Sequence, residues 1–237
     1  MTFSVVARDP QTGAVGAAVA SASLACAAWV LHVRGGAGAI ASQATSNPFY
    51  GPDGLQLLAD GRAPDEIVAT VTAPDPVREL RQLLIVDASG KAAAFTGSEC
   101  LSYAGHVAGD GFVIGGNRLA EGVIEAMRDN FESNYGHALQ ERLLLALEAG
   151  DAAGGDRCGR QSAGLVVADH PDFARYNLRV DDHESPLPEL RRLVALRREV
   201  VGKYDGFTPT RDQPLPPGFL ESWPELKKQY EVEEVKS

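Results

Sequence analysis

The residue directly after the initiator methionine carries both groups that an N-terminal nucleophile needs. If Met1 is removed, Thr2 becomes the N-terminus and holds a hydroxyl and a free α-amine on one residue. An α-amine has a pKa of about 7.7–8.0, so a fair fraction of it is unprotonated near neutral pH and can activate the hydroxyl. Because Thr2 is small, we expect Met1 to be removed. The alternative is that Thr2 is simply the first residue of a β-strand.

A second candidate for chemistry is the sequence Gly115-Gly116-Asn117, which lies between an apolar segment and a helical pattern. Glycines allow close approach of the backbone, and N–H groups there, together with the Asn117 amide, could hold an oxyanion. The alternative is a tight turn in which Asn117 is the N-cap of the following helix.

Polar residues that could bind a substrate lie in the second half of the chain. Arg160 and Gln161 could recognise a carboxylate, because a guanidinium forms bidentate pairs with planar anions. Arg160 could instead pair with Asp181 or Asp182 as a structural clamp. Asp181, Asp182 and His183 suggest an acid–histidine pair or half of a metal site. On a strand, only Asp181 and His183 would share a face.

The composition argues against several kinds of partner and cofactor. The formal net charge of −10 disfavours nucleic acid and anionic membranes, since both bind basic surfaces. Three dispersed cysteines (Cys26, Cys100 and Cys158) fit buried thiols better than a disulfide framework or metal cluster. The five histidines are equally scattered. We therefore expect no metal, no cofactor, and no nucleic-acid or membrane partner.

Length and patterning predict one domain and a short tail. The 237 residues suit a domain over 1–202, followed by a proline-bearing tail over 203–237. The tail carries Phe207, Leu215, Phe219, Leu220 and Trp223, and we expect it to pack on the body or on a partner subunit in a homo-oligomer. The chain opens with no charged-then-apolar leader and has no apolar run of about 18 residues. We therefore expect a cytoplasmic protein.

The elements that position these residues follow from apolar periodicity. Thr2 to Ser23 predicts a β-hairpin, with Pro10 and Gly13 in its turn. Further strands are expected at 29–33, 37–43, 81–87, 91–97, within 103–116, at 162–168 and at 176–180. Helices are expected from 55, from 63, and at 121–131, 139–149 and 187–201. Strand groups that alternate with helix pairs predict two sheets between two helical layers.

Several blocks in order along the chain resemble one family. They are Thr2–Asp9, Ser42–Pro48, Tyr50–Pro52, Gly115–Asn117, Gly159–Ala163 and Arg179–His183. Together they resemble a bacterial family of unknown function, numbered 1028, that is grouped with the Ntn-hydrolases. The resemblance implies the α+β fold of that group, a four-layer αββα sandwich of two mainly antiparallel sheets.

With this resemblance, we expect a hydrolase that cleaves an amide bond in a small-molecule substrate, such as a cyclic amide, an acylated amino acid or a short peptide. Thr2 would attack the carbonyl and Asn117 would hold the oxyanion. The expected substrate contacts are Arg160, Gln161, Asp182 and His183, together with Asn47, whose polar loop could form a pocket wall or a surface connection. The competing hypothesis is a non-catalytic binding or assembly protein on the same scaffold.

Overall fold

The computed structural model describes residues 2–204, 208–209, 211–214, 218–225 and 228. It begins with the hairpin of β1 (Thr2–Arg8) and β2 (Val15–Ser21). In the turn, the Asp9 carboxylate accepts hydrogen bonds from the Gln11 amide and the Thr12 hydroxyl. Gly13 has φ of 75°, which glycine adopts at little cost. The predicted hairpin and its turn glycine are confirmed.

Two antiparallel sheets form the centre of the molecule. The larger has the order β10-β9-β2-β1-β8-β7, and the smaller has the order β3-β4-β5-β6. The remaining strands of the larger sheet are β7 (Gly105–Gly109), β8 (Phe112–Asn117), β9 (Ser162–Ala168) and β10 (Tyr176–Val180). Those of the smaller sheet are β3 (Leu31–Arg34), β4 (Gly38–Ala44), β5 (Arg81–Asp87) and β6 (Ala92–Thr96).

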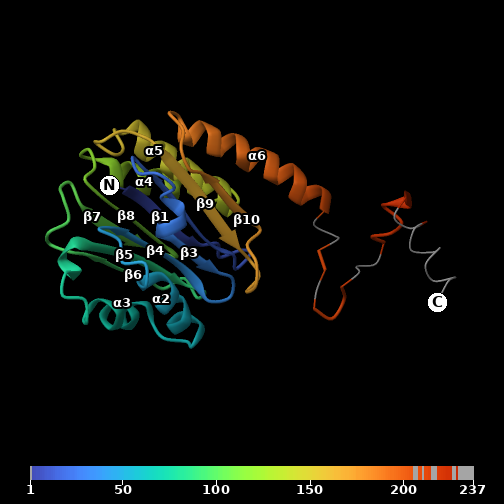
Figure 1. Ribbon diagram of the computed structural model, residues 1–237, viewed down its shortest axis with the longest axis horizontal. Coiled ribbons are helices and arrows are strands. Elements are labelled where there is room, and N and C mark those ends of the chain that lie inside the picture. Colours follow the sequence, from blue (N-terminus) through green and yellow to red (C-terminus); the bar gives the residue numbers. More distant parts are fainter. Residues whose placement is uncertain (1, 205–207, 210, 215–217, 226–227, 229–237) are drawn as a thin grey trace. The chain divides into compact units, whose positions relative to one another are not determined.

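One helical pair covers the outer face of each sheet (Figure 1). Helices α4 (Val123–Ser133) and α5 (Leu139–Ala152) lie on the larger sheet, and α2 (Tyr50–Ala59) and α3 (Pro64–Thr72) lie on the smaller one. At Gly150 of α5, a Cβ would lie 3.3 Å from Cδ2 of Phe3, so Phe3 points toward this helix. The four-layer αββα sandwich is therefore confirmed.

The space between the sheets is filled by small and β-branched side chains. Val6, Val19, Ala41, Leu84 and Val113 are fully buried in this cluster. Alternation along β1 places Phe3 and Val5 toward the helices, and Ser4 and Val6 toward the other sheet. Thr2 lies on the same side of β1 as Ser4, so its side chain faces the intersheet space.

Three expected elements differ in the structure. Residues 103–116 form the hairpin β7–β8 and not one strand, because Asp110 and Gly111 (φ 73°) form a two-residue turn. The strand expected from Trp29 begins at Leu31, after the short helix α1 (Ala27–Val30), and Trp29 is exposed. The helix expected from residue 55 begins at Tyr50.

The last helix, α6 (Pro186–Tyr204), crosses the boundary between two units, Met1–Val194 and Ala195–Ser237. In the first unit, Leu190 and Val194 are buried, and Arg191 pairs with Glu141 and Glu148 of α5. In the second unit, the rings of Phe219 and Trp223 stack at 6.4 Å between centroids.

Two residues of the predicted tail interface, Phe207 and Leu215, lie outside the described part, so the packing of the tail stays a prediction. No helix among the described residues is both long and apolar enough to cross a membrane.

Candidate active site

Four polar residues form a row across one end of the larger sheet. Thr2 is paired with Ser21 of β2 on one side and with Asn117 of β8 on the other, and Ser21 is paired with Ser162 of β9. Residues directly opposite each other in antiparallel strands have side chains on the same face. We call Asn117, Thr2, Ser21 and Ser162 the polar row. All four are buried, and Thr2 is 5% exposed.

Hydroxyl groups are connected within the polar row. Thr2 Oγ1 lies 3.2 Å from Ser21 Oγ, and either atom can donate. Ser21 Oγ also accepts a hydrogen bond from the Ser23 amide at 3.2 Å. Ser162 Oγ donates to the Ser23 carbonyl at 2.5 Å and accepts from the Cys26 amide at 3.1 Å. The row therefore anchors the loop after β2 and gives the Thr2 hydroxyl a polar partner.

On the other side of Thr2, a buried amide group contacts Asn117. Asn117 Nδ2 donates to Gln82 Oε1 at 3.2 Å, and Gln43 Nε2 donates to the same oxygen at 2.8 Å. Ser4 Oγ donates to Gln43 Oε1 at 2.5 Å. These contacts join β1 and β8 of the larger sheet to β4 and β5 of the smaller one beside Thr2.

Sequence reasoning missed Gln43 and Gln82. The available signal was a long amide side chain within a buried strand, as in Gln82-Leu83-Leu84. Such a residue is costly to bury unless it is hydrogen-bonded.

The glycines before Asn117 allow β8 to approach β1 closely. A Cβ on Gly116 would lie 2.9 Å from the Thr2 carbonyl oxygen and 2.5 Å from Leu119 Cδ1. Asn117 is the last residue of β8, whereas the next helix begins at Val123 after Gly122. The alternative of Asn117 as a helix N-cap is therefore wrong.

Backbone strain gathers at the same end of the sandwich. Three non-glycine residues among those described have left-handed backbone angles: Ala25 (φ 50°), Ala44 (φ 70°) and Arg118 (φ 60°). Ala25 lies in the loop after Ser21, and Arg118 directly follows Asn117. Ala44 directly follows Gln43. Such conformations are costly for residues with a Cβ and concentrate at functional sites.

Of the predicted substrate contacts, Gln161 comes near the polar row. Its amide donates to the Ser21 carbonyl at 2.9 Å, and its Nε2 donates to Asp182 Oδ1 at 3.1 Å. The His183 amide donates to the Gln161 carbonyl at 2.8 Å. The structure thus brings Gln161, Asp182 and His183 together beside Ser21, on the far side of β2 from Thr2.

Arg160 has a different partner from the one expected. Its Nε donates to Asp151 Oδ1 of α5 at 2.5 Å, and this hydrogen bond raises the pKa of Arg160 above its usual value. The proposed clamp to Asp181 or Asp182 is therefore wrong. Arg160 remains half exposed beside Gln161. Because its partner Asp151 belongs to α5, Arg160 is held by the helical layer and not by the polar row.

Asp181 and His183 do not form the acid–histidine pair that was considered. β10 ends at Val180, so strand alternation does not extend to them. Arg179 binds Asp181 through two hydrogen bonds of 3.0 and 2.7 Å and lowers the pKa of that carboxyl. His183 Nδ1 accepts from the Ser185 amide at 2.9 Å. Within the described residues, no three His, Cys, Asp or Glu side chains gather where they could hold a metal ion.

Asn47 lies in a different cluster, around Asp75. Its Nδ2 donates to Asp75 Oδ2 at 3.1 Å, as do the Tyr50 hydroxyl at 2.8 Å and Arg81 Nε at 3.1 Å. Burial disfavours the charged carboxylate, but hydrogen bonds from the Val77 amide and these three side chains outweigh it and lower the pKa of Asp75 to about 2.

This Asp75 cluster is separated from Thr2 by the smaller sheet. Arg81 and Gln82 are adjacent on β5, so their side chains point to opposite faces. Gln82 faces Asn117, whereas Arg81 faces the layer of α2 and α3. The structure therefore does not bring Asn47 to the polar row.

The cysteines are free thiols, but only Cys26 is buried, and Cys158 is exposed. The expectation of three buried thiols is therefore wrong. Burial raises the pKa of the Cys26 thiol to about 11, so it is protonated and a poor nucleophile at neutral pH. Although Cys26 lies close to Ser162, it does not compete with Thr2 as an attacking group.

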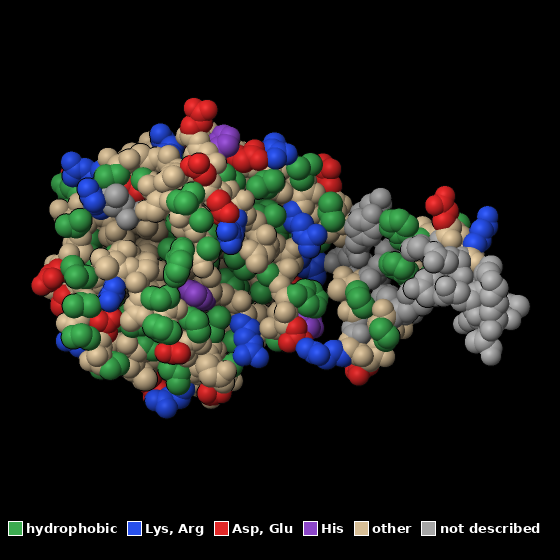
Figure 2. Space-filling view, in the orientation of Figure 1, with side chains coloured by type: hydrophobic (Ala, Val, Ile, Leu, Met, Phe, Trp, Pro, Cys, Tyr) green, Lys and Arg blue, Asp and Glu red, His purple; other side chains and the backbone are tan. Residues whose placement is uncertain are grey.

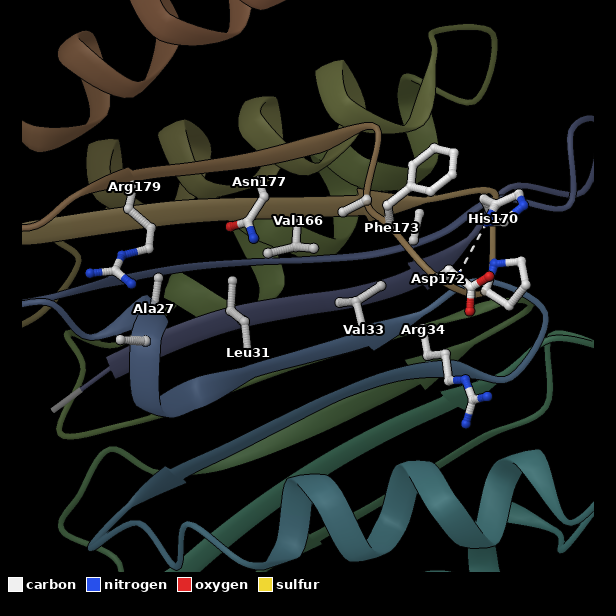
Figure 3. Close-up of a pocket in the computed structure, with 14 residues that line it drawn as sticks. Ala27, Leu31, Val33, Arg34, Val166, His170, Asp172, Phe173, Asn177 and Arg179 are labelled. Carbon is white, nitrogen blue, oxygen red and sulfur yellow. Dashed lines mark hydrogen bonds between the residues drawn. The ribbon is translucent and has the colours of Figure 1, made fainter. Parts of the chain in front are cut away.

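A separate groove of about 540 Å³ runs along the open edges of the two sheets (Figure 3). Leu31 and Val33 of β3 line one side, and Val166 and Asn177 of β9 and β10 line the other. None of the polar row lines this groove. Figure 2 shows acidic and basic side chains interspersed over the visible face of the first unit.

Comparisons with known proteins show the family. The crystal structure of protein SPO2555 from Silicibacter pomeroyi is 37% identical, with a TM-score of 0.81, and the match covers 91% of this chain and 94% of that one. Anbu, the ancestral beta-subunit from Yersinia bercovieri, is 13% identical with a TM-score of 0.40, and the match covers 88% of this chain and 99% of that one. No curated protein matches the chain. The model of the family of unknown function DUF1028 matches residues 2–190, and the chain therefore belongs to this family.

Proposed function

We propose that the protein is an N-terminal-nucleophile hydrolase that cleaves an amide bond in a small molecule. The observation that carries the proposal is the position of Thr2 between Ser21 and Asn117. Thr2 is at the start of a central strand, with a hydroxyl partner on one side and an amide donor on the other.

In the proposed first step, Thr2 Oγ1 attacks the amide carbonyl and gives its proton to the free Thr2 α-amine. The amine holds that proton and transfers it to the leaving nitrogen when the C–N bond breaks. An ester between Thr2 and the acyl group remains. Ser21 Oγ, 3.2 Å from the attacking oxygen, orients the hydroxyl and relays the proton.

The negative charge on the carbonyl oxygen requires a donor in the transition state. Asn117 Nδ2 has two hydrogens, and Gln82 Oε1 uses one of them. The other is available to the oxyanion. A donor of this kind contributes about 10²–10³-fold to the rate in other hydrolases. Water then attacks the ester with the α-amine as base, which releases the acid and regenerates Thr2.

Polar groups on the far side of β2 from Thr2 support the substrate-recognition part of the proposal. Gln161, Asp182 and His183 lie together there, and Arg160 lies beside them. Amide and carboxylate groups in this position suit a polar substrate such as a cyclic amide, an acylated amino acid or a short peptide.

A small aliphatic β-lactone tests the nucleophile without knowledge of the substrate. Attack by Thr2 opens the lactone, forms an ester on Oγ1 and transfers the proton to the ring oxygen. We expect intact mass and peptide mapping to find one ester at Thr2 in native, untagged protein and in Thr2→Ser. Thr2→Ala should give none. An unmodified wild type, or equal modification of Thr2→Ala, would contradict the proposal and favour a non-catalytic protein.

A further inference from the structure

The carboxamide of Gln82 connects the two sheets beside Thr2. It belongs to the smaller sheet and is fully buried. Its oxygen accepts two hydrogen bonds, and its nitrogen, which carries two hydrogens, lies 2.9 Å from three acceptors that share them. The acceptors are the Thr96 hydroxyl and the carbonyls of Gly105 and Gly116, and the donors to the oxygen are Gln43 and Asn117.

These contacts fix which way the Gln82 amide points. Backbone carbonyl oxygens only accept hydrogen bonds, so the atom that faces Gly105 and Gly116 must be the nitrogen. The oxygen of Gln82 consequently faces Asn117. An oxygen can only accept, and therefore the Asn117 atom that contacts Gln82 must be its nitrogen, Nδ2.

The orientation of Asn117 follows from Gln82 and not from Asn117 itself. A free asparagine amide rotates between two nearly equivalent orientations and would present oxygen or nitrogen in turn. Oxygen in place of nitrogen would repel an oxyanion. We infer that Gln82 is a positioning residue that holds Asn117 Nδ2 available as the oxyanion donor beside Thr2. This inference rests on the proposed hydrolase function.

Gln43 provides a matched control. Gln43 and Gln82 are the same residue type, both are fully buried in strands of the smaller sheet, and both donate and accept in the same network. Of the two, Gln82 is the one hydrogen-bonded to Asn117. A merely structural role would give similar effects for Gln82→Met and Gln43→Met, because methionine has nearly the same shape and no comparable hydrogen-bonding groups.

The test is the rate of Thr2 acylation by the β-lactone, separated into the maximal acylation rate constant (kinact) and the lactone concentration at half-maximal rate (KI). Urea unfolding of each variant measures its stability. We expect Gln82→Met to lower kinact by about 10²-fold or more with KI unchanged, as Asn117→Ala should. Gln43→Met should lower kinact less than tenfold, although its loss of stability should be similar to that of Gln82→Met. The double variant Gln82→Met/Asn117→Ala should be no slower than Asn117→Ala, because both remove one donor.

Equal losses of kinact in Gln82→Met and Gln43→Met, or multiplying losses in the double variant, would overturn the inference. If the wild type is acylated at Thr2 and Gln82→Met is acylated at the same rate, the inference about Gln82 is overturned and the hydrolase proposal stands. A wild type that is never acylated overturns both. If Gln82→Met does not fold, NMR of wild-type protein decides. Slow solvent exchange of one Asn117 side-chain amide proton supports the inference, because that proton is hydrogen-bonded to Gln82, and rapid exchange of both protons contradicts it.

Discussion

The hydroxyl oxygens of Thr2 and Ser21 lie 3.2 Å apart because the opening hairpin pairs these two residues directly. The pairing depends on the turn at Gly13 and its neighbours, which sets the register of the hairpin. A slip of one residue in the hairpin register would turn one of the two side chains to the opposite face. The polar row is thus a consequence of the turn that begins the fold.

Removal of the Ser21 hydroxyl should slow the reaction without abolishing it. Thr2 keeps its α-amine in Ser21→Ala but loses the partner that orients its hydroxyl. We expect β-lactone acylation to fall by about 10²-fold, the lower end of what a positioned proton-transfer group contributes. Ser162→Ala is the matched control, since Ser162 lies in the same row without contacting Thr2. Equal rates in the two variants would remove Ser21 from the mechanism.

A methyl group on Gly116 should disturb Thr2 through the backbone. In Gly116→Ala the new Cβ would lie 2.9 Å from the Thr2 carbonyl oxygen, so β1 or β8 must shift. We expect a loss of about 1–3 kcal/mol in the free energy of unfolding, typical of overpacking, together with slower acylation. Gly105, the strand partner of Gly116, is the control, because a Cβ there meets only Ile124 Cδ1 at 3.7 Å. Gly105→Ala should be close to neutral, and equal losses in both would contradict the steric account.

Protonation of Asp75 should lower the free energy of unfolding in acid without affecting catalysis. Its pKa in the folded state is about 2, below the unfolded value of about 3.9. A depressed pKa contributes stability that is present above about pH 4 and is lost as the pH falls toward 2. Asp75→Asn should therefore lose about 2 kcal/mol at pH 7, the usual size of a hydrogen bond to a charged group.

The difference between Asp75→Asn and wild type should shrink below pH 4, as followed by urea unfolding across pH. The exposed turn residue Asp110 supplies the control Asp110→Asn. Acylation of Thr2 should be unchanged in both variants, since the Asp75 cluster lies on the outer face of the smaller sheet. A pH-independent stability difference would show that the charge of Asp75 contributes little.

Local signals predicted the hairpin, the helical pairs and the layer order. Pro10 and Gly13 marked the first turn correctly, whereas the equally plain signal Asp110-Gly111 was overlooked within a longer apolar segment. The start of β3 was misjudged because Trp29 has high strand propensity, yet it lies exposed on a short helix. These are errors of local pattern, and the alternation of strand and helix groups still gave the architecture.

The candidate site depends on contacts that the sequence does not encode locally. Periodicity predicted that Thr2 lies on a strand, but not that Asn117 lies opposite it. Asn117 is 115 positions later in the chain and pairs with Thr2 because β8 is the neighbour of β1. The network of Gln43 and Gln82 arises only where two sheets meet. Asn47 illustrates the converse: its polar loop could have formed a wall of the pocket, but its side-chain amide binds Asp75 on the outer face of the smaller sheet.

The most direct test of the N-terminal-nucleophile account is the intact mass of native protein made without an N-terminal tag. The mechanism needs a free α-amine on Thr2, and this amine exists only after Met1 is removed. The account predicts a mass that lacks Met1 and an N-terminal peptide that begins at Thr2. Met1 fully retained in the native protein would contradict it, because the base that activates the Thr2 hydroxyl would then be a peptide bond.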